Sequence, residues 1–269
     1  MSNDRLRPDD LPDFRKPPLH EVVIGIQFNP PKKYQQIYAN EVWGLFRAEY
    51  SEVEEHDAIP PSFETFGLPS KGQHLSLTVG PVHSRFWFVR PNGDELIQFQ
   101  GDRLIHNWRK VGDEKNEYPR FESMIQRFHG EIGQLESYVN GLSPQTLVIS
   151  QCEISYINHI LLIDEAPNAS DWLCFLEFGG EEADDFSVVF REVISAEDKP
   201  YARLTCDARL GVKSDQQRII QLTLTVRGFP RGSDVDSALE FMSKGRDLIV
   251  RKFADITTPA AHIKWERIR

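Results

Sequence analysis

Two neighbouring segments of the sequence, residues 201–212 and 218–228, alternate strictly between apolar and polar side chains. The apolar positions are Leu204, Cys206, Ala208 and Leu210 in the first segment and Ile220, Leu222, Leu224 and Val226 in the second. A period of two places every second side chain on the same face of a strand, so each segment is expected to bury one face and expose the other. Such alternation is typical of antiparallel sheets with one solvated face.

The remaining pattern predicts an α+β protein. Further strands are expected at residues 21–28, 75–79, 84–91, 95–110, 151–160, 186–194 and 261–268. Helices are expected at residues 33–50, 119–139 and 234–253, and the run at 171–178 is interpreted as a short helix rather than a buried strand. In the clearest of these, apolar residues at helical spacing follow Pro119, which a first helical turn tolerates.

The order of these elements nearly repeats on either side of Gly141–Pro144, which is the best candidate boundary. We expect an N-terminal arm at residues 1–18, rich in proline, a first half at 19–143 and a second half at 144–269. Each half is expected to contribute strand, helix, three strands and helix to an antiparallel sheet with helices on one face. The prediction of an internal duplication depends on this order, because no repeat is visible residue by residue.

The composition excludes several classes of protein. With 31 basic and 41 acidic residues the net charge is −10, which disfavours nucleic acid and anionic membranes as partners. Three cysteines without a CxxC pair disfavour a disulfide framework or a cysteine-rich zinc site. The N-terminal residues carry no apolar signal region, and no apolar run approaches the roughly 20 residues of a membrane span. A cytoplasmic protein is therefore expected.

Three stretches carry a family resemblance: PPLHEVVIGIQF at 17–28, ELIQFQGDRLIHNWRK at 95–110 followed by YPRFESMIQRF, and SQCEISYINHI at 150–160. Together they resemble an uncharacterised bacterial family that is distributed sporadically among genomes. The resemblance covers most of the chain in order. It implies an accessory gene of a defence or toxin–antitoxin locus, and it implies no catalytic residue or cofactor.

The candidate ligand-binding residues lie on the expected strands. The first half supplies Gln98, Gln100, Arg103, Asn107, Trp108 and Arg109, and the second half supplies Arg203, Arg209 and Arg227. Amide side chains both donate and accept hydrogen bonds, arginine offers a planar fork, and tryptophan offers a stacking surface, so this set is suited to a base, a carboxylate or a peptide. The alternative is that these residues form an ordinary solvated sheet face.

No catalytic or metal-binding motif is present. None of the eight histidines lies at HxxxH or HExxH spacing, there is no GxSxG, and Cys152 and Cys206 fall on apolar strand faces where a thiol is inert. The acidic stretches at 52–57 and 177–185 are interpreted as solvated loops, the alternative being a surface for a basic partner.

These observations favour a non-enzymatic protein that recognises a protein or small ligand through the polar sheet face or a cleft between the halves, with no cofactor. One alternative is a nucleic-acid-binding accessory protein. It requires Arg203, Arg209 and Arg227 to form one positive stripe with the basic C-terminal segment, where residues 244–269 carry seven basic and three acidic side chains. The other alternative is a small enzyme with an unrecognised site.

Overall fold

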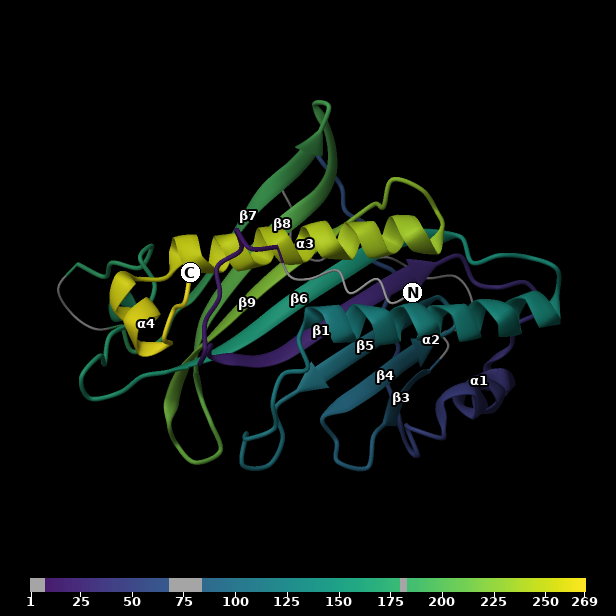
Figure 1. Ribbon diagram of the computed structural model, residues 1–269, viewed down its shortest axis with the longest axis horizontal. Helices are drawn as coiled ribbons and strands as arrows, with labels where there is room; N and C mark the ends of the chain where they lie inside the picture. The colour runs from purple at the N-terminus through teal and green to yellow at the C-terminus, as the bar shows by residue number, and fades with distance from the viewer. Residues whose placement is uncertain (1–7, 68–83, 180–182) are drawn as a thin grey trace.

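The computed structural model describes residues 8–67, 84–179 and 183–269 (Figure 1). Its strands are β1 (Leu19–Phe28), β2 (Glu52–His56), β3 (Arg85–Val89), β4 (Glu95–Gln100), β5 (Arg103–Arg109), β6 (Ile149–Leu161), β7 (Ser187–Ala196), β8 (Lys199–Val212) and β9 (Arg218–Gly228). Its helices are α1 (Ala39–Phe46), α2 (Phe121–Leu142), α3 (Val235–Ile256) and α4 (Pro259–Lys264), with short 3₁₀ turns at Gln36–Tyr38 and Ala169–Asp171. The predicted α+β class is confirmed.

All nine strands of the described chain belong to one antiparallel sheet, in the order β2-β3-β4-β5-β1-β6-β9-β8-β7. Strands β1 and β6 form the central pair of the sheet. On one side, β1 is followed outwards by β5, β4 and β3, and on the other side β6 is followed in the corresponding order by β9, β8 and β7. The two halves therefore have matching topologies and meet at the β1–β6 pair. The strand order agrees with the expected outline, except that β2 has no counterpart among the described strands of the second half. The duplication itself stays a prediction.

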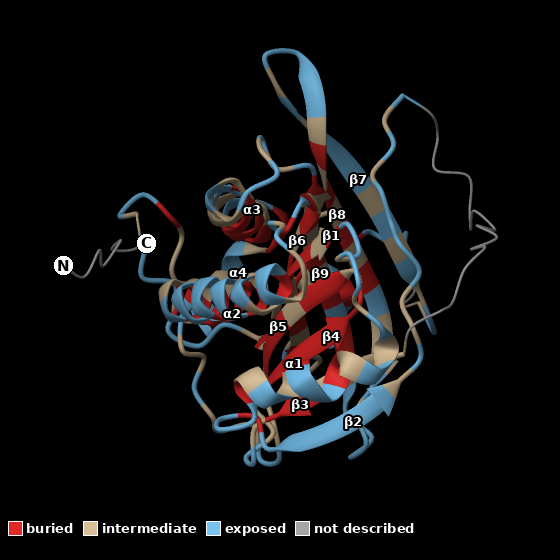
Figure 2. Cartoon of the chain, turned by 90° about the vertical axis from the view of Figure 1, so that its right-hand side faces the viewer, coloured by how far each residue is buried: buried red, intermediate tan, exposed pale blue. Residues whose placement is uncertain are grey.

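Helices α2 and α3 cover the same face of the sheet (Figures 1 and 2). Ile24 is paired with His106 on one side and Ile154 on the other, so these three side chains form a row on that face. Gly245 lets α3 approach the row, because a Cβ atom there would lie 2.6 Å from Cγ2 of Ile154. Asp234 caps α3, since its carboxylate accepts the backbone N–H of Ser237 at 2.9 Å.

Apolar side chains from both halves form one contiguous core between the sheet and the helices. The expected burial of Cys152 and Cys206 in this core is confirmed, and Cys174 is exposed. Within the described residues, no helix is long and apolar enough to span a membrane.

Two expectations near the chain's C-terminal half are wrong. Residues 261–268 do not form a strand: α4 begins at Pro259, and the Thr258 hydroxyl caps it by accepting the N–H of Ala261 at 3.1 Å. Proline at the first helical position and a threonine cap favour a helix strongly enough to override a short alternating pattern. The run at 171–178 is not a helix, because after the 3₁₀ turn it is irregular and Leu173 makes an isolated bridge to Thr257.

Three expectations in the first half also need correction. Residues 95–110 form two strands, β4 and β5, because the turn at Gly101-Asp102 reverses the chain and pairs Gln100 with Arg103. The acidic stretch from Glu52 is an edge strand, β2, rather than a loop; charged residues suit an edge because they discourage pairing with another chain. The helix expected at 33–50 is shorter, and the strand expected at 75–79 lies outside the described residues.

Candidate functional site

The face of the sheet opposite the helices is polar. The strand register places one row of side chains there from Arg103 through Gln27 to Gln151, across β5, β1 and β6. The predicted residues that share this face are Gln98, Gln100, Arg103, Asn107, Arg109, Arg203, Arg209 and Arg227. The two halves therefore bring their predicted residues to one surface, as the alternation indicated.

Trp108 is the predicted residue that does not belong to this surface. Neighbouring residues of a strand point to opposite faces, so Asn107 on the polar face places Trp108 on the helix side. It is 1% exposed, and its ring centroid lies 5.0 Å from that of Tyr118. The prediction that Trp108 stacks on a ligand beside the other residues is therefore wrong.

Gln98 and Asn107 belong to a buried chain of hydrogen bonds. Arg85 donates to Oε1 of Gln98 at 2.6 Å, and Nε2 of Gln98 donates to Oδ1 of Asn107 at 2.9 Å. Asn107 then donates to the Glu21 carboxylate at 2.6 Å. Burial raises the pKa of Glu21, which the hydrogen bond from Asn107 and the charge of Arg109 partly oppose. These amides are held by protein groups, as a structural role requires.

Three of the predicted arginines are held by nearby groups. Arg103 makes two 3.0 Å hydrogen bonds to the carboxylate of Asp102, and Arg209 makes two to Asp207. Arg109 donates to the backbone carbonyl of Gly93 at 2.9 Å. These contacts fix the planes of the guanidinium groups, and they neutralise the charge of Arg103 and of Arg209.

The polar face is crossed by residues 57–67, which we call the covering segment. Gln100 contacts both backbone groups of Ile59: its Oε1 accepts the N–H at 2.9 Å and its Nε2 donates to the carbonyl at 3.1 Å. Farther along, the backbone N–H of Ser62 donates to Oε1 of Gln27 at 3.3 Å, and Arg227 donates to the Ser62 hydroxyl at 3.2 Å. The side chains of the sheet therefore hold the segment by its backbone.

Arg203 holds the far end of the covering segment. It donates to the Glu64 carboxylate at 2.8 Å and to the carbonyl of Thr65 at 2.6 Å. Its guanidinium carbon also lies 5.6 Å from the ring centroid of Phe66, within cation–π range. Gln100 and Arg203, which the sequence marked as ligand-binding, thus bind a segment of the chain itself.

A pocket lies between the covering segment and the sheet, where the two halves meet. Its floor includes Gly25 on β1, which leaves a hollow because it has no side chain, and Arg103, Gln27 and Gln151 line one side. The pocket encloses about 570 Å³, a volume that includes open solvent. We call it the seam pocket.

Gln151 is the unusual residue of the seam pocket. It is 3% exposed, yet neither its Oε1 nor its Nε2 has a hydrogen-bond partner among the described residues. Buried amide groups are nearly always hydrogen-bonded, and leaving one without a partner costs about 1–3 kcal/mol. A donor and an acceptor without a partner therefore belong to a residue of the pocket lining.

Glu153 and Arg227 also line the seam pocket. They are paired across β6 and β9, and Arg227 makes an ion pair with the Glu153 carboxylate. The pocket lining thus combines uncharged amides with a neutralised ion pair. Sequence reasoning missed Gln27 and Gln151, although Gln151 lies two residues before Glu153 on the same alternating segment, which was the signal for it.

A second polar cluster lies on the helix side of the sheet. His106 is fully buried, and its Nδ1 lies 3.0 Å from both oxygens of Glu131 while its Nε2 lies 3.6 Å from Glu95. Tyr50 donates to Glu131 at 3.0 Å. The spacing of the histidines in the sequence did not reveal this cluster, because Glu131 lies 25 residues from His106 in the chain. Within the described residues, no group of three or more His, Cys, Asp or Glu side chains is arranged so that it could hold a metal ion.

Comparisons with known protein families, with curated proteins and with solved structures find no match to this chain.

Proposed function

We propose that this protein is a binding protein that holds a small polar ligand in the seam pocket. The observation that carries the proposal is the buried amide of Gln151, a residue of the pocket lining, whose two polar atoms have no hydrogen-bond partner among the described residues. An unpartnered buried amide destabilises the folded protein, so it calls for an explanation. A ligand in the pocket that forms hydrogen bonds with the Gln151 amide would offset this cost.

The surroundings of Gln151 limit the chemistry of the ligand. An amide that offers a donor and an acceptor side by side is complementary to a molecule with an adjacent acceptor and donor, such as a primary amide or the edge of a planar heterocycle. Arg103 is neutralised by Asp102 and Arg227 by Glu153, so the pocket does not supply an unpaired charge for an ionic ligand. We therefore infer that the ligand is neutral and carries such an edge.

The covering segment supports recognition of a ligand that is enclosed rather than a flat surface contact. It lies over the pocket at Ile59 and Ser62, and sheet side chains hold it there. An accessory role in a defence or toxin–antitoxin locus, which the family resemblance implies, is compatible with a protein that responds to a small ligand.

The nucleic-acid alternative has less support. Helix α3, which carries four of the basic residues of the segment 244–269, lies on one side of the sheet. Arg203, Arg209 and Arg227 lie on the other side, so they do not form one stripe with it. Each of these arginines also makes an ion pair with a carboxylate. Nucleic-acid binding depends on cations that neutralise phosphates, typically about 6–10 of them.

Native mass spectrometry of the untagged protein, purified at low salt, tests the proposal. We expect a mass excess that corresponds to one discrete small molecule in the wild-type protein. The excess should disappear in Gln151→Leu and persist in Gln221→Leu, a matched change at an exposed glutamine on the same sheet face.

Two results would contradict the proposal. One is an adduct that Gln151→Leu retains, because the ligand would then lie elsewhere. The other is a bare mass together with no thermal stabilisation by any member of a panel of nucleobases, nucleosides and primary amides. An adduct with ribose-phosphate fragments that is lost at high salt would favour the nucleic-acid alternative instead.

A further inference from the structure

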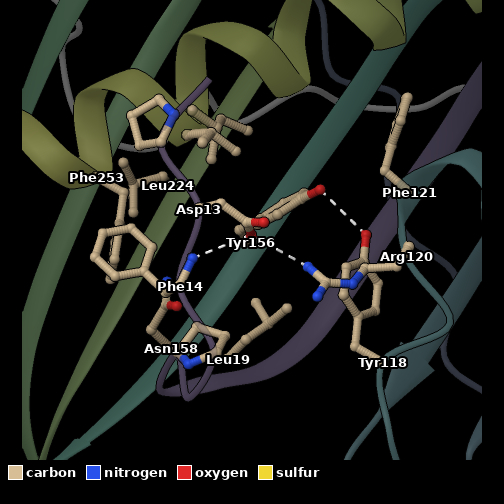
Figure 3. Close-up of a pocket in the computed structure, with 14 residues that line it drawn as sticks. Asp13, Phe14, Leu19, Tyr118, Arg120, Phe121, Tyr156, Asn158, Leu224 and Phe253 are labelled. Carbon is tan, nitrogen blue, oxygen red and sulfur yellow. Dashed lines mark hydrogen bonds and ion pairs between the residues drawn. The ribbon is translucent and has the colours of Figure 1, made fainter. Parts of the chain in front are cut away.

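A second pocket lies on the helix side of the sheet, between α2 and α3 (Figure 3). Its floor is formed by Leu19, Asn158 and Leu224 of the sheet, and Phe121 and Phe253 of the two helices form its walls. It encloses about 580 Å³, including open solvent. We call it the interhelix pocket. Like the seam pocket it lies where the two halves meet, but the sheet separates the two.

The N-terminal arm covers the interhelix pocket. Phe14 of the arm enters the pocket lining and forms an isolated bridge with Arg267 near the C-terminus. The backbone of Asp13 also donates to the carbonyl of Arg269 at 3.1 Å, and Asp10 pairs with Arg251 on α3. These contacts tie down the described part of the arm, residues 8–18, and give the pocket its cover.

Most of the pocket lining is apolar, and its polar residues other than Asp13 and Arg120 are uncharged. The hydroxyls of Tyr118 and Tyr156 lie 3.1 Å apart at one side (Figure 3). Burial raises the pKa of Tyr118, so its hydroxyl stays protonated. Asn158 is 3% exposed, and its Nδ2 donates to the carbonyl of Leu222 at 3.2 Å.

The charges at the rim of the pocket are paired with each other. The Arg120 guanidinium lies 3.3 Å from the Asp13 carboxylate, which also accepts the N–H of Phe14 at 3.0 Å (Figure 3). A charged ligand would have to leave water for an apolar cavity without a free counter-charge, which costs far more than burying a neutral group that keeps one hydrogen bond. The pocket therefore discriminates by charge as well as by polarity.

We propose that the interhelix pocket is a second binding site, for an uncharged and mostly apolar small molecule whose single hydrogen-bonding head group lies against Tyr118, Tyr156 and Asn158. The apolar body of the molecule packs between Phe121, Leu224 and Phe253. The site is independent of the ligand proposed for the seam pocket, because no residue lines both pockets.

Isothermal titration calorimetry with four probes of the same chain length tests this inference. The probes are octanol and octanamide, which have neutral heads, and octanoate and octylammonium, which are charged. We expect the neutral probes to bind at least about tenfold more tightly than either charged probe, since tenfold corresponds to only ~1.4 kcal/mol and desolvating a charge costs more. Equal affinity for all four, or the absence of binding, would overturn the proposal.

Variants locate the binding. Tyr118→Phe should weaken octanamide binding about two- to tenfold, the effect of one neutral hydrogen bond, whereas Tyr38→Phe outside the pocket should not. Val250→Trp should abolish binding of both neutral probes by filling the cavity. If Val250→Trp does not fold, the result for Tyr118→Phe alone tests the location of the site. Gln151→Leu should leave octanamide binding unchanged, so the test of the interhelix pocket is separate from the test of the seam pocket. Unchanged octanamide binding in Tyr118→Phe would refute the assignment of the head group to Tyr118.

Discussion

Replacing Gln151 by leucine should stabilise the protein in the absence of ligand. The side chain is 3% exposed, and its donor and acceptor are both buried without a partner among the described residues. Leucine is close to glutamine in size and carries no polar atoms, and the pocket wall around it includes Val23, Ile59 and Ile105. The change therefore removes a penalty and adds apolar contact.

The magnitude follows from the two atoms involved. Each buried polar group without a hydrogen bond costs about 1–3 kcal/mol, and the Gln151 amide has two such groups. Leucine recovers only part of the combined penalty, because its branched end fits the site imperfectly. We expect the free energy of unfolding to rise by about 1–3 kcal/mol. At roughly 2–4 °C per kcal/mol for a large domain, the melting temperature should rise by several degrees.

Gln98→Leu is a matched control with the opposite expected sign. Gln98 is 6% exposed on the same sheet face, but it accepts from Arg85 and donates to Asn107. Leucine there would leave both partners unsatisfied, so the free energy of unfolding should fall by about 1–3 kcal/mol. The two variants therefore separate a glutamine that holds the fold from one that is kept for binding.

Urea unfolding followed by circular dichroism measures both variants against the wild-type protein. The midpoint should move up for Gln151→Leu and down for Gln98→Leu, with similar slopes. If Gln151→Leu destabilises the protein as much as Gln98→Leu does, the Gln151 amide is satisfied within the folded protein in solution. The reasoning that assigns it to a ligand would then be refuted.

Three further predictions concern stability and reactivity. Glu131→Leu should lower the free energy of unfolding by about 3–5 kcal/mol in urea titrations, because it removes the partner of buried His106. Gln134→Leu, at an exposed position, should have little effect, and equally small effects of the two changes would contradict the prediction. Burial lowers the pKa of His159 to about 4, so the unfolded state binds a proton at higher pH than the folded state does, and the free energy of unfolding should fall as the pH is lowered from about 6.5 to 4. His159→Gln should reduce this loss of stability, and an equal loss in the variant would contradict the prediction. Maleimide should modify Cys174 alone in the native protein, because burial raises the pKa of the other two thiols; mass spectrometry would reveal a second label.

Local patterns were sufficient for most of the elements. Alternation identified β8 and β9 with their buried faces, and helical spacing identified α2 and α3, because those periods report directly which side chains can share a face. Local patterns failed where the signal was short or where tertiary contacts decided, as in the irregular run at 171–178 and the helix α4.

The candidate site was only half predictable. The alternation of side chains along each strand placed Gln98, Gln100 and Asn107 on one polar face. The same alternation places Trp108 on the opposite face, although the sequence analysis included it in the candidate site. Alternation does not reveal which polar side chains already form hydrogen bonds with other groups of the protein. That distinction requires the partners, and the partner of Gln100 is the backbone of Ile59, more than forty residues away.

The sequence by itself determined the α+β class, the sheet with one apolar and one polar face, and the helices that cover the apolar face, because each depends on spacing within one element. Only the tertiary structure decided that β1 and β6 join the halves into one sheet, that the covering segment lies across the polar face, and that Gln151 is buried without a partner. These features depend on which distant segments meet, and a pattern of local periods does not encode those contacts.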